Sequence, residues 1–252
     1  MKKMKHRVAM AAIMTFVCSS VVHATIIYQN DFVSAPTMIA ANAAVFDGTA
    51  GAALEVGEFA IAANSANYNF GSGEMAYTND ANASGGARAR TIGVAIDISG
   101  ADQNQFEVSF DITQFGIPNV TDDDQVNFGA WHFSGVSSGN GVSVDMQKNA
   151  VDFDPDFTPA GIAGATQLLG GNQQLTATGA FSDTFTLGSV GAGDYIFIAW
   201  TSTSDDTEAP STQLPKFAVD NIVLETIPEP ATLGLIAAFG GGIMFIRRRF
   251  MM

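Results

Sequence analysis

The sequence contains a single cysteine, Cys18, in 252 residues. It lies in an N-terminal segment that we expect to be removed, as argued below, so the mature chain has no thiol. A disulfide scaffold, a cysteine nucleophile and a thiolate metal centre are therefore excluded.

Basic residues are also scarce, with eleven Lys and Arg against 25 Asp and Glu. Seven of the eleven lie near the chain ends. Residues 25–227 keep only four basic side chains against 24 acidic ones, a formal net charge of −20. Such a domain repels phosphate backbones, so we expect no nucleic-acid partner, whereas divalent cations are compatible with it.

Histidine is nearly absent, because His132 is the only one between residues 25 and 227. A serine triad would have to be built around it, and no G-x-S-x-G motif accompanies it. One histidine without cysteine is also a poor zinc site. The compact Glu-x-Asp-x-x-Glu strand motif of some glycosidases is missing as well. We interpret His132 as structural and predict no catalytic residue.

Residues 1–24 have the three zones of a secretion signal. Residues 1–7 are cationic, residues 8–22 are apolar, and Val22 and Ala24 supply small side chains before the predicted cut. The apolar run is shorter than the ~20 residues that a comfortable transmembrane helix needs. We therefore expect export by the Sec translocon and cleavage by signal peptidase after Ala24.

The other end, residues 228–252, combines a Pro-Glu-Pro motif, an apolar run and an arginine cluster. These are Pro228, Glu229 and Pro230, then residues 231–246, then Arg247, Arg248 and Arg249. As a helix the run spans about 24 Å, enough to cross a locally thinned bilayer. The arginines predict a cytoplasmic C-terminus. We expect a single C-terminal transmembrane helix with the preceding domain outside.

This C-terminal pattern resembles the PEP-CTERM sorting signal in its order, spacing and position. The resemblance implies an envelope protein whose tail is processed near Pro-Glu-Pro by a membrane transpeptidase of the exosortase type. It also implies a surface-attached or extracellular product associated with exopolysaccharide and biofilm. It covers only the tail, so it assigns no activity to the domain.

Residues 25–227 are predicted to form one exported β-sandwich domain. Short apolar runs alternate with Gly, Asn, Asp and Ser clusters, and no amphipathic helix is evident. In residues 105–116, for example, Phe106, Val108 and Phe110 alternate with polar residues. Further strands are expected at residues 25–32, 59–70, 89–99, 125–133, 141–147, 181–187, 195–202 and 217–226. The pattern favours two packed antiparallel sheets in a jelly roll.

The opening residues 27–32 and the closing residues 217–224 resemble the first and last strands of carbohydrate-binding-module jelly rolls. Related domains often bind a structural calcium ion near those strands. We therefore expect Asp31 and Asp220 to form a calcium site, since oxygen ligands suit this ion. No other cofactor is expected.

Aromatic side chains are the candidate carbohydrate-binding residues. Trp131 lies beside His132, so one of these two side chains should face outward. Tyr68 and Tyr77 flank a Gly-Ser-Gly loop, where exposure is expected. Trp200 lies in a run that is apolar on both faces, so we assign it to the core.

Taken together, the sequence predicts a non-enzymatic, exported envelope or matrix protein that contacts polysaccharide or other matrix proteins. A calcium-stabilised carbohydrate-binding module is the first alternative. A jelly-roll glycosidase or lyase, which would need two carboxylates ~5–10 Å apart, is the second.

Overall fold

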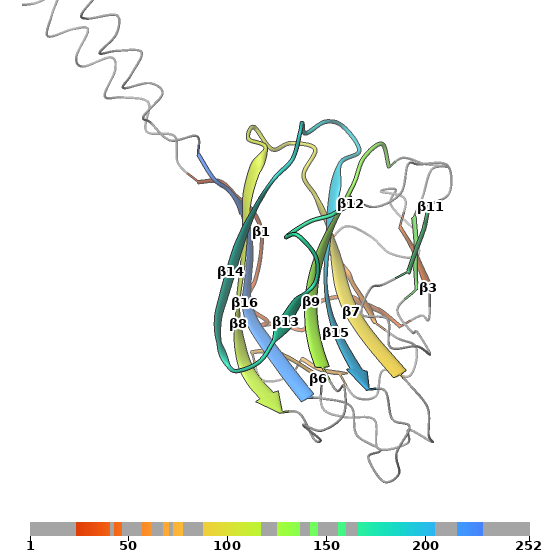
Figure 1. Cartoon of the computed structure of the whole chain (residues 1–252), viewed down its shortest axis with the longest axis vertical. Helices are drawn as coiled ribbons and strands as arrows, with labels where there is room; N and C mark the ends of the chain where they lie inside the picture. Colours follow the sequence, from red (N-terminus) through yellow and green to blue (C-terminus); the bar gives the residue numbers. More distant parts are fainter. Residues whose placement is uncertain are drawn as a thin grey trace, which may run out of the picture. The chain divides into compact units, whose positions relative to one another are not determined.

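The computed structural model describes residues 24–40, 43–46, 57–61, 68–70, 73–77, 88–116, 125–136, 142–145, 156–159, 166–204 and 216–228. Residues Ile26–Thr226 form one compact unit. The regular elements of the described residues are all β-strands (Figure 1). The expectation of an all-β, antiparallel domain is confirmed.

The strands form three sheets, here called A, B and C. Sheet A has the order β14 (Gly179–Thr186), β8 (Gln105–Gly116), β16 (Lys216–Thr226), β6 (Met75–Tyr77) and β5 (Tyr68–Asn69), and β1 (Ile26–Asn30) also pairs with β16. Sheet B has the order β12 (Thr166–Gln167), β9 (Gln125–Phe133), β15 (Tyr195–Ser204), β7 (Arg88–Asp97), β4 (Phe59–Ile61) and β2 (Met38–Ala40), and β13 (Gln173–Leu175) also pairs with β9. Sheet C has the order β11 (Asp156–Pro159), β10 (Val142–Asp145) and β3 (Ala43–Phe46). Among the described strands, β2 and β4 form the one parallel pair.

In sheet A, buried and more exposed side chains alternate along the long strand β8 with a period of two residues. In β8, Phe106, Val108 and Phe110 are buried, while the residues between them are partly exposed. This matches a strand with one face on the core and one face toward solvent. The neighbouring strand β16 adds Val219, Ile222 and Leu224 to the same core.

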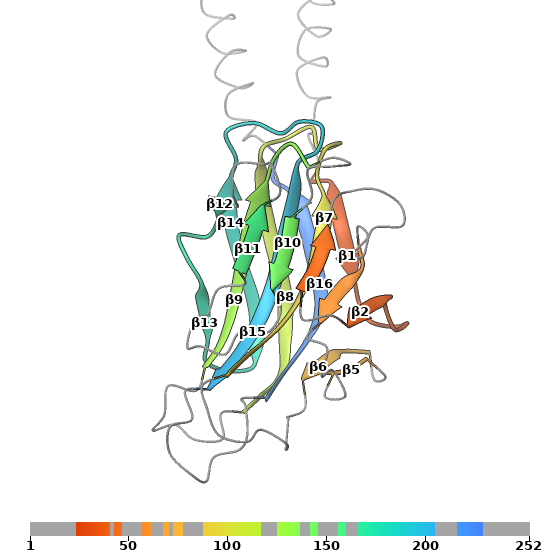
Figure 2. The same ribbon diagram turned by 90° about the vertical axis from the view of Figure 1, so that its right-hand side faces the viewer.

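Sheet B is buried on both faces. Tyr195 to Ser202 in β15 are all buried, and β15 lies between β9 and β7, the central position that its doubly apolar sequence predicts. One face contributes Ile196, Ile198 and Trp200 to the core shared with sheet A. On the other side lies sheet C, which Figure 2 shows in front of β9, β15 and β7.

Three details differ from the sequence-based expectations. A third sheet is added to the two expected. Residues 157–177, for which no strand was expected, contribute to strands β11, β12 and β13 where they are described. The run at residues 59–70 yields two short strands, β4 and β5, in different sheets. The assignment to a jelly roll stays a prediction.

None of the described residues belongs to a helix long and apolar enough to cross a membrane. Residues 1–23 and 231–246, the predicted signal and membrane span, lie outside the described residues.

Candidate functional site

The two ends of the folded unit lie next to each other. Strands β1 and β16 are antiparallel neighbours, with Ile26 paired to Glu225, and Thr226 is paired to Phe106 of β8. Ala24, the predicted cleavage residue, is exposed and is separated by one residue from Ile26, where β1 begins. Pro228 follows Thr226 after one intervening residue. Glu229, Pro230, Arg247, Arg248 and Arg249 lie outside the described residues.

Strand β1 is held at this edge partly by Tyr28, which packs against the core. Burial raises the pKa of the Tyr28 phenol, and a hydrogen bond from Asn30 Nδ2 at 3.3 Å opposes part of this rise. Tyr28 is therefore held in its neutral form.

The predicted calcium ligands belong to these neighbouring segments. Asp31 follows Asn30, whose partner in the ladder is Ile222, and Asp220 lies two residues before Ile222. Each carboxylate accepts a local backbone N–H, from Val33 for Asp31 and from Asn221 for Asp220. Within the described residues, no group of three or more His, Cys, Asp or Glu has a spacing that could hold a metal. Calcium at Asp31 and Asp220 stays a prediction.

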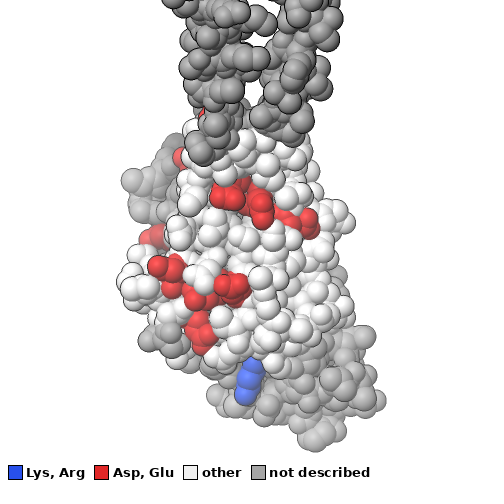
Figure 3. Space-filling view, turned by 90° about the vertical axis from the view of Figure 1, so that its left-hand side faces the viewer, with Lys and Arg blue, Asp and Glu red and all other residues white. Residues whose placement is uncertain are grey.

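The outer face of sheet A is acidic (Figure 3). Carboxylates lie directly opposite each other on β8 and β16, where Glu107 pairs with Glu225 and Asp111 pairs with Asp220. Hydrogen bonds offset part of the repulsion, because Asn221 Nδ2 donates to Asp111 at 2.9 Å and Ser182 Oγ donates to Glu107 at 2.5 Å.

The expected exposure of Tyr77 is wrong. Tyr77 lies in the short strand β6, is only 2% exposed and stacks on Phe217 with 5.9 Å between ring centroids. The tertiary contact with β16 covers a residue that its Gly-rich neighbourhood suggested would be open. The backbone of Tyr68 lies in β5, and its side chain is outside the described residues. The assignment of Trp200 to the core is confirmed, since it is fully buried against Phe110 and Phe128.

Trp131 lies on the face of sheet B that points away from the main core. It is paired across the strands with Phe197, whereas His132 is paired with Ile196 of the opposite, core-directed face. The Trp131 ring lies over Gly129, where an added Cβ would come within 2.2 Å of the indole. A glycine is therefore required beneath the ring, because any side chain there would displace it.

What we call the Trp131 cluster comprises the residues Asn127, Gly129, Trp131 and Phe197 of this face, together with the amides of Gln167 and Asn172. Gln167 of the edge strand β12 is paired with Trp131 and donates a hydrogen bond to Asn172 Oδ1 at 2.9 Å. Asn172 Oδ1 also lies close to Gly129. The amide Nδ2 of Asn127 has no hydrogen-bond partner in the described part of the chain, although Asn127 is only 4% exposed.

A buried amide donor that is left unpaired costs about 1–3 kcal/mol. The Trp131 ring itself is only 4% exposed, so the cluster is open to solvent mainly at its Gln167 rim. The alternation of polar, small and aromatic residues at 127, 129 and 131 was readable in the sequence. The contribution of Gln167 and Asn172 could not be predicted from the sequence, because it depends on pairing between distant segments.

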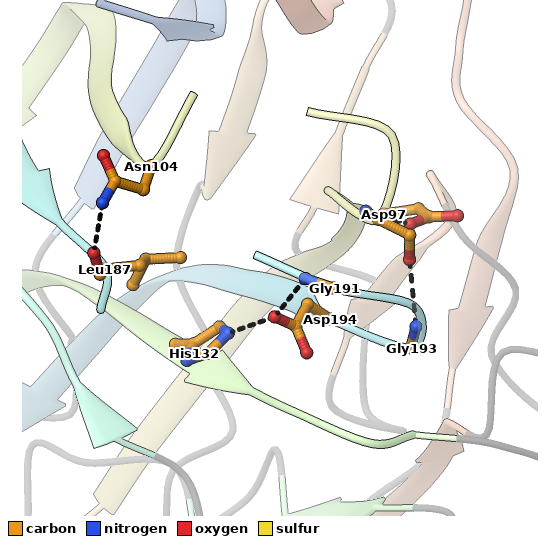
Figure 4. A network of polar contacts seen from close by, with 8 residues as sticks. Asp97, Asn104, His132, Leu187, Gly191, Gly193 and Asp194 are labelled. Carbon is orange, nitrogen blue, oxygen red and sulfur yellow. Dashed lines mark hydrogen bonds and ion pairs between the residues drawn. The ribbon is translucent and has the colours of Figure 1, made fainter. Parts of the chain in front are cut away.

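His132 and Asp194 form a largely buried pair in the described chain (Figure 4). His132 Nε2 lies 3.5 Å from Asp194 Oδ2, which also accepts the backbone N–H of Gly191 at 3.0 Å. Ser99 lies in the same network, where its hydroxyl accepts the N–H of Gly193 at 3.1 Å. Together these contacts connect strand β9 with the loops that follow β7 and β14.

No protein-family model matches the sequence, and no curated protein matches it significantly. Solved structures do match. The CBM2 module of the evolved Dit of Lactobacillus casei BL23 phage J-1 is 12% identical with a TM-score of 0.39, over 82% of this chain and 98% of that chain. TmCBM27, a carbohydrate-binding module described for specific mannan recognition, is 12% identical with a TM-score of 0.32, over 82% of this chain and all of that chain. TM-scores this low carry no argument about function.

Proposed function

We propose that this protein is a non-enzymatic, exported surface or matrix protein whose β-sandwich is delivered by the C-terminal sorting signal. One observation supports this most directly. The predicted cut after Ala24 and the motif beginning at Pro228 flank the folded unit Ile26–Thr226, with one residue between each and the nearest strand. Processing at both points would therefore leave every described strand intact.

The proposed partners act in turn on the N-terminus, on the C-terminus and on the folded domain. The Sec translocon and signal peptidase would act at the N-terminus, and an exosortase-type transpeptidase would act near Pro228, Glu229 and Pro230. The product would be shed or attached to the envelope. The acidic domain would then meet exopolysaccharide or other matrix proteins, with divalent cations bridging its carboxylates.

Expression of the full chain in a host with and without a processing transpeptidase tests the sorting proposal. We expect a released or transferred product that lacks residues 1–24 and ends near Pro228, as measured by mass spectrometry of both termini. A variant with Pro228, Glu229 and Pro230 replaced by alanine should keep its tail, and a Ser182→Ala variant is the matched control. Identical processing of all three chains would refute the sorting signal.

A specific observation favours a second candidate function, glycan binding at the Trp131 cluster. Gln167 is paired with Trp131, is exposed at the rim and donates to Asn172, and the same face of β9 carries Asn127, whose amide Nδ2 has no hydrogen-bond partner among the described residues. Apolar sugar faces pack on aromatic rings, and amides bind hydroxyls, so this is the chemistry that a neutral polysaccharide needs.

Purified residues 25–227 should be tested against a panel of polysaccharides, first with calcium and then with chelator. Saturable binding that Gln167→Ala and Trp131→Phe weaken, but that Ser182→Ala leaves unchanged, would support the module function. Absence of saturable binding under both conditions would leave the scaffold function alone. Binding that requires calcium and is lost in Asp220→Asn would instead support the predicted calcium site.

A further inference from the structure

One end of the sandwich, which we call the terminal end, carries both ends of the folded unit and three loops. Ladder pairs define this end: Ile26 with Glu225, Phe106 with Thr226, Gln105 with Thr186, Tyr195 with Asp97, and Tyr195 with Phe133. The described residues of the loops that leave these strand ends are 98–104, 134–136 and 187–194.

Hydrogen bonds tie these loops to one another (Figure 4). Ile98 N donates to Asp194 O at 3.1 Å, and Val136 N donates to Gly193 O at 2.9 Å. Leu187 N donates to Asn104 O at 2.8 Å, and Asn104 Nδ2 returns a bond to Leu187 O at 3.0 Å. Because backbone groups from all three loops are satisfied by their neighbours, the terminal end has a defined surface.

The exposed residues of these loops have small side chains, apart from one carboxylate. They are Gly100, Asp102, Ser134, Gly135, Gly188, Ser189, Gly191 and Ala192. At the strand ends, Ile26 and Asp97 are exposed as well. The three loops contain no lysine or arginine. A surface of this kind lets another backbone approach closely, and its negative charge disfavours adsorption to anionic lipid headgroups.

Covalent geometry limits how far a processing enzyme can stay from this surface. Thr226 is fixed in the ladder, and Pro228 is two residues further along the chain. An extended chain covers at most ~3.6 Å per residue, so Pro228 lies within about 7 Å of Thr226. An enzyme that reaches a peptide bond near Pro228 must therefore come close to the end of β16, which lies at the terminal end.

We infer that the terminal end is the docking surface of the membrane transpeptidase that processes the tail. This inference rests on the proposed sorting function. The small, hydrogen-bonded loops let the enzyme approach the bond while β16 stays in its sheet. The same enzyme would also contact β1, because Ile26 lies beside Glu225.

The test uses the full chain in a host that contains the transpeptidase. Ser134→Trp and Ser189→Trp each place a bulky ring on an exposed position of the terminal end. Lys216→Trp is the matched control, because Lys216 is exposed and its pairing with Gly116 puts it at the opposite end of sheet A. Each variant is also made with a flexible Gly-Ser spacer of about ten residues between Ile227 and Pro228, which adds roughly 17 Å of reach.

We expect both terminal-end variants to be processed at least about fivefold more slowly than the wild type, and the spacer to restore the rate. The Lys216→Trp variant should match the wild type, and all variants should melt as folded domains. Wild-type rates in both terminal-end variants would overturn the docking surface while leaving the sorting function intact. Equal slowing in the Lys216→Trp variant, or slowing that persists with the spacer, would also overturn it. A wild-type chain that is never processed would remove the sorting function and this inference together.

Discussion

At the scale of single residues, Gly193 decides whether the loops of the terminal end can close. Its φ is +77°, and an added Cβ would lie 2.6 Å from the carbonyl oxygen of Val136. Backbone atoms cannot move aside as a flexible side chain can. The position therefore needs glycine for its conformation and for space.

We expect Gly193→Ala to lower the free energy of unfolding by about 2 kcal/mol or more. Gly191→Ala is the matched control, because nothing lies within 4 Å of the added Cβ there, and its effect should stay within about 0.5 kcal/mol. Urea unfolding followed by tryptophan fluorescence measures both variants, since Trp131 and Trp200 are buried in the folded protein. Equal losses in the two variants would contradict the steric argument.

Tyr28 gives the domain an alkaline sensitivity. Its folded-state pKa is raised by burial, so the unfolded chain loses the phenol proton at a lower pH than the folded chain does. The stability from neutral Tyr28 is thus fully present below its unfolded pKa of ~10 and is lost as pH rises through the folded pKa. Between about pH 8 and about pH 10.5, which lie on either side of the unfolded pKa of ~10, Tyr28→Phe should lose less stability than the wild type. Parallel losses in denaturant melts at the two pH values would argue against this role.

At the scale of elements, strand β14 is an edge strand that pairs only with β8 among the described strands. Asp183 pairs with the buried Val108, so its position faces the core side of the sheet. A charge directed inward from an edge discourages another strand from adding to it. The strand therefore carries its own protection against edge-to-edge association.

Asp183→Val should remove this protection, and we expect dimers or larger species at concentrations where the wild type stays monomeric. Light scattering after size-exclusion chromatography measures the change. Thr184→Val is the control, because the residue lies on the outer face of the same strand, opposite Glu107. If the two variants associate equally, added β-propensity and not the lost inward charge is responsible.

The pairing of β8 with β16 places like charges opposite each other, at Glu107 with Glu225 and at Asp111 with Asp220. Like charges directly opposite in a sheet are destabilising, and salt screens them. We expect Glu225→Gln to raise the free energy of unfolding by about 0.5 kcal/mol at low ionic strength. The gain should shrink toward zero in 1 M salt, roughly where the Debye length falls to ~3 Å. A gain that does not depend on salt would assign the effect to something other than charge.

At the scale of the whole molecule, the last strand of the chain is central to its fold. Strand β16 pairs with β8 on one side and with β1 and β6 on the other, and it supplies Phe217, Val219, Ile222 and Leu224 to the core. Sheet A is incomplete without β16, which is formed by the residues just before the predicted sorting motif. Folding of the domain is thereby tied to the presence of its last strand.

A chain ending at Ile227 should therefore fold cooperatively, whereas a chain ending at Pro215, which lacks β16, should not. Circular dichroism and thermal melting distinguish the two. A cooperative melt of the shorter chain would show that sheet A does not depend on β16. Loss of folding in both chains would mean that residues beyond Ile227 contribute to the fold.

Several strands follow directly from local sequence. Residues 105–116 and 125–133 are strands over the predicted ranges, because alternation or continuous apolar character fixes which side chains each face must bury. The placement of Trp200 follows from the same signal. These are properties of one segment at a time.

Other features depend on contacts between segments far apart in the chain. Tyr77 is buried because β6 pairs with β16, more than a hundred residues later, and no local pattern announces that partner. The same holds for the Trp131 cluster, where Gln167 reaches its neighbours only through the pairing of β12 with β9. Sheet C is a further case, since its short strands carry too few residues for a clear alternation.

The sequence alone determined the all-β class, the acidic character of the domain and the predicted address at the two chain ends, because composition and short-range periodicity encode them. Tertiary structure alone decided that β1 and β16 are neighbours, and hence that Ile26 and Thr226 lie at the same end of the sandwich. It also decided which aromatic side chains are buried. The physical reason is that strand pairing joins residues distant in sequence, and the backbone hydrogen bonds that make the pair are the same for almost any side chains.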